Sequence, residues 1–179
     1  MPLQRILTSP IGPLLLTVTH GAITGLTMGS PVHALPPNFS THPSNHVDVR
    51  TADAAQTQLA EYFAAARTRF DLPLSPHGTP FQQRIWAALK PIPYGQTQSY
   101  LDIAKVIDPA RAANLSRAVG QANGANPIGI IVPCHRVIAA SGKLSGYAGG
   151  ATAKQWLLDH ERQTAGVISP RPETRFCCS

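Results

Sequence analysis

Apolar and polar residues alternate over the first 30 positions, in three short runs separated by turns. The runs are residues 3–9, 14–20 and 22–28, and the separators are the turn sequence PIGP and Gly21. Alternation with a period of two, bounded by Gly and Pro, is typical of half-buried β-strands. We therefore expect a three-stranded antiparallel meander at the start of the chain.

The pattern changes after residue 28. Residues 29–48 are rich in Pro, Ser, His and Asn and predict a loop. Its histidines lack Cys or carboxylate neighbours, so we expect solvent-exposed side chains and no metal site. Residues 51–70 place apolar side chains, Leu59, Tyr62 and Phe63 among them, at helical spacing and predict a helix.

The second half opens with helix-start signals. Thr79, Pro80 and Gln82 form a predicted capping box with proline in the first turn. A second helix over residues 99–107 begins with Ser99 and has Asp102 three residues on, which is the same kind of signal. Two short capped helices in succession resemble a helix-turn-helix.

A third helix is predicted to begin at Asp108 and Pro109 and to run through Arg117 to about Asn123. An apolar run over residues 128–132, a strand over 136–140 and a last helix over 152–162 follow. These elements predict an α/β (α+β) fold with two domains. The predicted parts are an N-terminal domain 1–72, a linker 73–78, a C-terminal domain 79–165 and a flexible tail 166–179.

Charge is unevenly distributed along the chain. The formal net charge is +6, and residues 81–158 contain eight Lys and Arg but only Asp102 and Asp108 as acids. Such a basic segment favours a polyanionic partner. A merely soluble basic surface is the alternative.

The chain is expected to be cytoplasmic. No apolar stretch reaches the roughly 18 residues that a membrane span needs, and the first ten residues do not form a signal peptide. Thiols stay reduced in the cytoplasm. Of the three cysteines, Cys177 and Cys178 lie in the predicted tail, where we expect no function.

The remaining cysteine stands in the sequence PCHRV, residues 133–137, directly after the apolar run. A buried cysteine is usually a small hydrophobic residue, but Cys134 is followed by His135, a potential base. In an extended segment these two side chains would point apart, so only a tight turn, which Pro133 favours, could bring both to one pocket. Glu161 could orient His135 if the last helix packs beside this turn; otherwise it is a solvated end charge.

Six motifs together are similar to those of the O6-alkylguanine-DNA alkyltransferases, also called methylated-DNA–protein-cysteine methyltransferases. The resemblance runs from about residue 79 to 162, and the first 70 residues match only in layout. It implies a ribonuclease-H-like N-terminal domain and a winged helix-turn-helix-like catalytic domain. The motifs are TPFQQRIWAAL, IPYGQTQSY, RAVGQANGANP, PCHRVI, SGYAGG and KQWLLDHE.

The resemblance implies a catalytic role for five residues. Cys134 accepts the alkyl group irreversibly, His135 takes its proton through a water, and Glu161 orients His135. Asn126 shapes the turn over the site. Tyr100 helps to rotate the target base out of the duplex and can donate a proton to the guanine.

The resemblance also implies contacts to double-stranded DNA containing O6-alkylguanine, with O4-alkylthymine as a possible second substrate. Arg117 is the finger that fills the space left by the flipped base. The other expected DNA contacts are Tyr100, Ser99, Ala118, Gly120 and Arg136. The expected pocket residues are Pro133, Val137, Tyr147 and Ala148, with backbone groups of Cys134 and Val137 meeting the guanine amino group.

Two departures from the family stand out. About three extra residues lie between Tyr100 and Arg117, and Leu115 replaces the usual alanine.

No cysteine precedes Cys134, so we expect no structural zinc, and no cofactor. The protein is expected to be a monomer, with cooperative binding to DNA left open. The rival hypotheses are a non-catalytic lesion-binding protein, which would lack the nucleophile, and an unrelated Cys-His-Glu hydrolase, which would not need Arg117.

Overall fold

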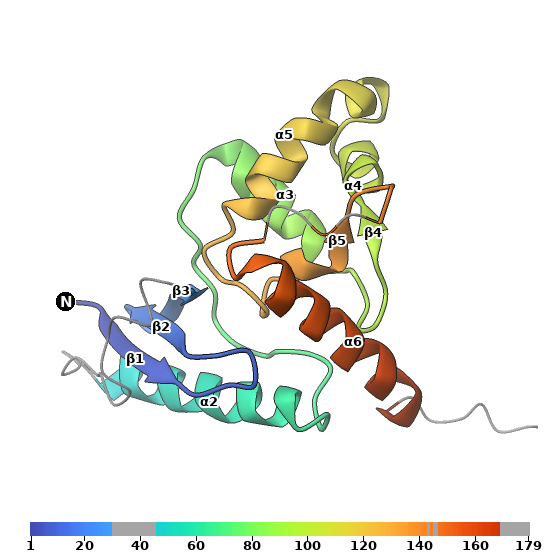
Figure 1. Ribbon diagram of the computed structural model, residues 1–179. Coiled ribbons are helices and arrows are strands. Elements are labelled where there is room, and N and C mark those ends of the chain that lie inside the picture. Colours follow the sequence, from blue (N-terminus) through green and yellow to red (C-terminus); the bar gives the residue numbers. More distant parts are fainter. Residues whose placement is uncertain (30–45, 143, 145–146, 169–179) are drawn as a thin grey trace, which may run out of the picture.

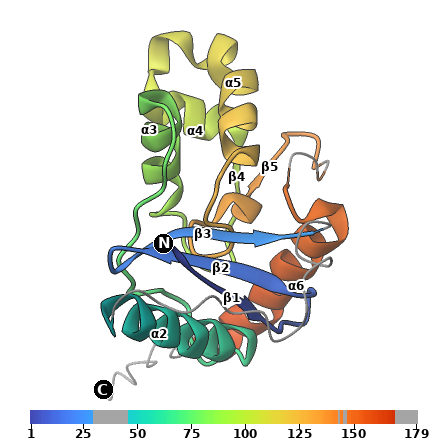
Figure 2. The same ribbon diagram turned by 90° about the vertical axis from the view of Figure 1, so that its left-hand side faces the viewer.

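The computed structural model describes residues 1–29, 46–142, 144 and 147–168. The N-terminal sheet is an antiparallel meander in the order β1-β2-β3, as its alternating pattern predicts. One helix packs against this sheet (Figures 1 and 2). The elements are β1 (Leu3–Leu7), β2 (Leu14–Thr19), β3 (Ala22–Met28) and α2 (His46–Phe63).

Helix α2 begins five residues earlier and ends seven residues earlier than the predicted 51–70. Its first turn is anchored on the β2–β3 turn, where Asp48 accepts a hydrogen bond from the Gly21 N–H and Thr51 donates to the Gly21 carbonyl. At its C-terminal end Ala65 adopts a φ of 59°, which stops the helix. Both ends are therefore set by contacts and backbone geometry that helical spacing alone does not reveal.

The second half is mostly helical, as expected. The capping boxes of Thr79 with Gln82 and of Ser99 with Asp102 are both formed. Its elements are α3 (Pro80–Leu89), β4 (Gln98–Ser99), α4 (Tyr100–Ile107), η1 (Pro109–Arg111), α5 (Ala112–Gly124), η2 (Cys134–Arg136), β5 (Val137–Ile138) and α6 (Gly150–Ile168).

The helix predicted from Asp108 is present, with one refinement. Asp108 caps a single 3₁₀ turn by accepting from the Arg111 N–H at 3.3 Å, and α5 continues from Ala112 to Gly124. Helices α4 and α5 pack against each other and against α3, where the Trp86 indole N–H donates to the Ala122 carbonyl at 2.8 Å. The 3₁₀ turn η1 therefore leads directly into α5, the helix that carries Arg117.

Two other elements differ from the sequence expectation. The predicted strand 136–140 is reduced to β5, because residues 134–136 form the 3₁₀ turn η2 and β5 has only the two-residue β4 as its parallel partner. Helix α6 extends beyond the predicted 152–162 at both ends. It runs along the body of the molecule from the loop after β5 to the side of α2 (Figure 1).

Backbone hydrogen bonds join the two halves of the chain. Leu26 of β3 accepts from the Gly129 N–H and donates to the Pro127 carbonyl, so β3 is bonded to the segment that leads to Cys134. The predicted linker is also bonded to β3, since Ile23 exchanges hydrogen bonds with Pro73 and Ser75. The N-terminal sheet thus supports the segment that carries the candidate nucleophile.

Some expectations concern residues that the structure does not describe. His33, His42, Cys177, Cys178 and most of the predicted tail lie outside the described residues. Among the residues that are described, no helix has the length and apolarity to cross a membrane.

Candidate active site

Cys134 stands in the tight turn that the PCHRV sequence predicts. Pro133 precedes the turn, the Cys134 N–H donates to the Val132 carbonyl at 2.8 Å, and the Val137 N–H returns to the Cys134 carbonyl. The thiol residue is 4% exposed. The turn is also tied to α5, because the Asn123 side chain donates to the Cys134 carbonyl at 3.2 Å.

Asn126 holds the loop in front of this turn. Its side-chain oxygen accepts from the Ile128 N–H at 3.1 Å, and its amide nitrogen donates to the Val132 carbonyl at 2.9 Å. Inside this loop Ile130 has a φ of 69°, a costly conformation for a β-branched residue. The Asn126 hydrogen bonds and the burial of the isoleucine stabilise the loop in this shape.

His135 and Glu161 form a buried pair. His135 Nε2 lies 2.9 Å from Glu161 Oε1, and both side chains are fully buried. Because a carboxylate can only accept, Nε2 carries the proton and Nδ1 keeps its lone pair. Nδ1 is buried without a hydrogen-bond partner in the structure. Burial lowers the pKa of His135, which the Glu161 carboxylate partly offsets, so the imidazole is neutral and Nδ1 is available as a base.

Glu161 is the centre of the polar network rather than a solvated end charge. Its two oxygens accept five hydrogen bonds. Although burial raises the pKa of the carboxyl, the hydrogen bonds from His135 and Arg136 and the Arg136 charge hold it well below its usual range. Glu161 therefore stays ionised and orients His135 without taking its proton. The donors are His135 Nε2, Arg136 Nε and Nη2, the Gly95 N–H and the Tyr62 hydroxyl.

Arg136 is placed differently from the expectation of a DNA contact. It is 6% exposed, and its guanidinium donates to both oxygens of Glu161 and, at 2.6 Å, to the Ile92 carbonyl. The side chain cannot reach a phosphate without breaking these bonds, because a buried Glu161 charge needs its counter-ion. A direct DNA contact by Arg136 therefore stays a prediction, and it would require this side chain to leave its partners.

A base and an orienting carboxylate next to a cysteine predict a lowered pKa for its thiol. In the structure the pKa of Cys134 is instead raised, because the thiol is buried. The neutral imidazole offers no positive charge to a thiolate. The Asn126 side-chain hydrogen bond and the Lys154 charge lower the pKa of Cys134, but less than burial raises it. The buried thiol therefore needs a base to ionise it.

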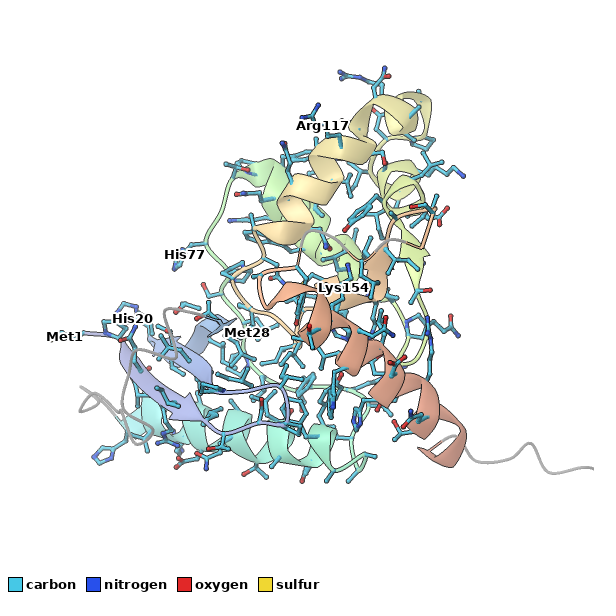
Figure 3. The ribbon with its side chains drawn as sticks, in the orientation of Figure 1. Met1, His20, Met28, His77, Arg117 and Lys154 are labelled. Atoms are coloured by element: carbon cyan, nitrogen blue, oxygen red, sulfur yellow. The ribbon has the colours of Figure 1, made fainter. Side chains whose placement is uncertain are left out.

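Lys154 is a site residue that the sequence analysis missed. It is fully buried, its ammonium donates to the Val137 carbonyl at 2.6 Å, and Nζ lies 6.0 Å from the centre of the Tyr100 ring. Figure 3 shows Lys154 inside the body of the molecule. A signal was available, since Lys154 is three and four residues before the apolar pair Leu157 and Leu158 and so shares their inward face.

The expected DNA-contacting residues lie around one open depression. Arg117 is exposed on the outer side of α5 (Figure 3). Tyr100 is half-buried, lines the depression and lies beside Lys154. Burial, and then the nearby Cys134, raise the pKa of its hydroxyl. The depression is lined by Tyr100, Ala113, Ser116, Arg117, Gly120, Gln121, Gly124 and Ala139.

Two expected DNA contacts, Ser99 and Ala118, and the unusual Leu115 are not in the lining of this depression. Ser99 caps α4, and Ala118 is half-buried. Leu115, the departure from the family pattern, is also half-buried and packs against the core instead of standing free on the outer face.

Of the expected pocket residues, Tyr147 lies beside His135. The Tyr147 ring lies 6.5 Å from the His135 ring, and its hydroxyl is buried without a partner. Tyr147 is followed by the exposed Ala148. The carbonyl of Val137, the expected acceptor of the guanine amino group, already accepts from Lys154 in the DNA-free structure.

Comparison with known proteins places this geometry in a family. The family model "6-O-methylguanine DNA methyltransferase, DNA binding domain" matches residues 80–163. The methylated-DNA–protein-cysteine methyltransferase of Mycobacterium bovis is 48% identical over 161 residues, covering 90% of this chain and 93% of the relative. The chain belongs to the methylated-DNA–protein-cysteine methyltransferase family. The constitutive methyltransferase of Bacillus subtilis is 43% identical over 155 residues, with 86% and 92% covered.

The similarity to a solved structure extends over both halves of this chain. The Mycobacterium tuberculosis OGT in complex with DNA aligns with a TM-score of 0.73 at 47% identity, covering 90% of this chain and 93% of that one. The similarity therefore includes the N-terminal sheet and α2, for which the sequence motifs carried no resemblance beyond layout.

Proposed function

We propose that this protein repairs DNA by transferring an alkyl group from O6 of guanine to Sγ of Cys134, once per molecule. The observation that carries the proposal is the buried turn in which Cys134 is followed by a neutral His135 bonded to Glu161. Membership of the family supports the reaction class. Guanine as the substrate rests on the family model, which names 6-O-methylguanine.

The chemical step is a displacement at the alkyl carbon. The Cys134 thiol gives its proton, through a bridging water, to Nδ1 of His135, and the sulfur forms a bond to the carbon as the bond from carbon to O6 breaks. The electron pair of the broken bond stays on the guanine, which takes up a proton from the Tyr100 hydroxyl; solvent restores that proton. Lys154 adds positive charge beside the thiolate, and it offsets part of the cost of ionising a buried sulfur.

The target base must leave the duplex to reach this buried thiol. The open depression on α5 faces solvent, and Tyr100 stands between it and Cys134. In the proposed complex Arg117 fills the gap that the flipped base leaves in the duplex. The small residues of α5 allow the duplex to approach this helix closely. Lesions occur in any sequence, so binding relies on phosphates and shape rather than on base-specific contacts.

The product is a thioether, which water does not cleave readily, so each molecule acts once. No step in this scheme requires a cofactor. The acceptor must be a reduced thiol, so we expect the protein to work in a reducing compartment such as the cytoplasm. A single chain supplies every group in the scheme, which is consistent with action as a monomer.

A transfer assay separates this proposal from its two rivals. Duplex DNA with radiolabelled O6-methylguanine is incubated with the protein, and both protein and DNA are recovered. Label on the protein at one equivalent supports the transferase. Tight binding of the lesion without transfer would support a lesion-binding protein, and neither binding nor transfer would leave the unrelated hydrolase.

A further inference from the structure

The network around Glu161 includes one donor from the other half of the chain. The hydroxyl of Tyr62, in the last turn of α2, donates to Glu161 Oε1 at 2.7 Å across 99 residues of sequence. Tyr62 is fully buried. The same oxygen, Oε1, also accepts hydrogen bonds from His135 Nε2 and Arg136 Nη2, so Tyr62 and His135 share one acceptor atom.

We propose that Tyr62 is a positioning residue for the transfer reaction: its hydroxyl sets how strongly Glu161 holds His135, and the N-terminal half of the chain thereby tunes the proton relay. This inference rests on the proposed function and deepens it. Arg136 and Gly95 already anchor the carboxylate from the C-terminal half. Tyr62 is the one donor among the five that comes from the N-terminal half of the chain.

Packing alone does not explain a tyrosine here. The ring of Tyr62 lies in an aromatic cluster, 5.3 Å from Phe63, 5.4 Å from Phe70 and 5.9 Å from Tyr94. A phenylalanine would fill the same space without a polar group to satisfy. The hydroxyl is aimed at the carboxylate that holds His135. Burial and the Glu161 charge raise the pKa of Tyr62 well above its usual value, so it remains a donor at every working pH.

The docking of α2 on α6 fixes this hydroxyl in place. The His160 ring lies 2.9 Å from the Tyr62 carbonyl, in hydrogen-bonding contact, and Trp156 packs against Phe63 with ring centres 5.9 Å apart. His160 also stacks on Trp156 at 4.9 Å. These contacts surround the end of α2 that carries Tyr62. The distance from the hydroxyl to Glu161 therefore reports how the two halves are docked.

The direction of the effect follows from charge. The hydrogen bond from the Tyr62 hydroxyl partly neutralises the negative charge on Glu161 Oε1. The hydrogen bond from His135 Nε2 to this oxygen is therefore weaker. Without the hydroxyl, Glu161 binds the imidazolium form more strongly, and the pKa of His135 rises. Other groups that act on this pair keep their places. The titratable or charged groups around Glu161 and His135 are Tyr62, Tyr94, Cys134, Arg136, Tyr147 and Lys154.

The experiment compares Tyr62→Phe with Tyr94→Phe. The Tyr94 hydroxyl bonds to Thr164 at 2.6 Å instead of Glu161, and its ring is in the same cluster, so this control loses the same atom nearby. Single-turnover transfer from duplex O6-methylguanine is measured from about pH 5 to pH 9. For Tyr62→Phe the acid limb shifts to higher pH, which lowers the rate there by about 3- to 10-fold, while the plateau stays within about 2-fold. Tyr94→Phe follows the wild type.

A second measurement does not depend on transfer. The ring ¹⁵N signals of His135, assigned by their loss in His135→Asn, are titrated in the DNA-free protein. The midpoint rises in Tyr62→Phe and is unchanged in Tyr94→Phe. If both titration and rate profile of Tyr62→Phe match the wild type, Tyr62 is only a packing residue and the inference is overturned. Wild-type protein that fails to transfer label would refute the proposed function instead, and the titration would still decide the role of Tyr62.

Discussion

His135 Nε2 and Glu161 Oε1 lie 2.9 Å apart in a region closed to solvent, and Nδ1 of the same ring has no partner. This single contact selects the tautomer. The proton is on the nitrogen that faces Glu161, and the lone pair is on the other. Proton removal from a buried thiol is the task that such a lone pair can perform.

Replacing the base tests that task. His135→Asn removes the ring nitrogen that accepts the proton, so we expect transfer at neutral pH to fall by about 10²- to 10⁴-fold, the usual contribution of a general base. Binding to lesion-containing duplex is expected to persist, because the depression on α5 is untouched. Full transfer activity in this variant would show that His135 does not accept the proton.

The pH dependence of stability tests the neutral state of His135. The pKa of His135 is lowered in the folded protein, whereas the unfolded chain has a value of about 6.5. Below that value the unfolded chain binds the extra proton and the folded protein does not, so stability falls as pH decreases. When the pH is lowered from about 7.5 to about 5, we expect the melting temperature of the wild type to fall more than that of His135→Asn. Parallel curves would contradict a neutral His135.

Lys154 is expected to set the reactivity of the thiol. Lys154→Met keeps the apolar stem but removes the charge that lowers the pKa of Cys134, so that pKa rises further. Because the reactive thiolate becomes scarcer, alkylation by iodoacetamide at neutral pH should slow by about 3- to 10-fold. Lys105→Met removes an exposed cation that only contacts Asp102, and its rate should match the wild type. Equal rates for all three proteins would remove Lys154 from the site.

Arg117 is expected to matter only when a base must leave a duplex. A wedge worth about 1–3 kcal/mol, like a side chain stacked on a base, corresponds to about a 5- to 150-fold loss of transfer from duplex DNA in Arg117→Ala. Transfer from free O6-benzylguanine needs no flipping and should hardly change. Arg111→Ala, which removes an exposed charge in η1, is the matched control. A similar loss on both substrates would mean that Arg117 is structural.

The sequence reveals features whose causes are local. The capping boxes at Thr79 and Ser99 and the start at Asp108 each depend on residues three or fewer positions apart, and all three are present. The tight turn at Cys134 follows from Pro133 in the same way. Local signals therefore placed the candidate nucleophile and its neighbour.

Features that arise from long-range packing were missed. Tyr62 meets Glu161 across 99 residues, and its helical spacing predicted only an apolar face. The early start of α2 depends on Asp48 reaching Gly21. The resemblance implies that Arg136 contacts DNA, but it does not show that Glu161 of α6 holds this side chain in the structure. Contacts between residues so distant in sequence cannot be predicted before the fold is known.

The most direct test of the account is the identity of the alkylated residue. After reaction with O6-methylguanine in duplex DNA, the protein is digested and its three cysteine sites are compared by peptide mass spectrometry. We expect the methyl group on Cys134 alone, at one per molecule, and no modified peptide from Cys134→Ala, which should still bind the duplex. A methyl group on Cys177 or Cys178, or transfer that survives in Cys134→Ala, would contradict the central claim.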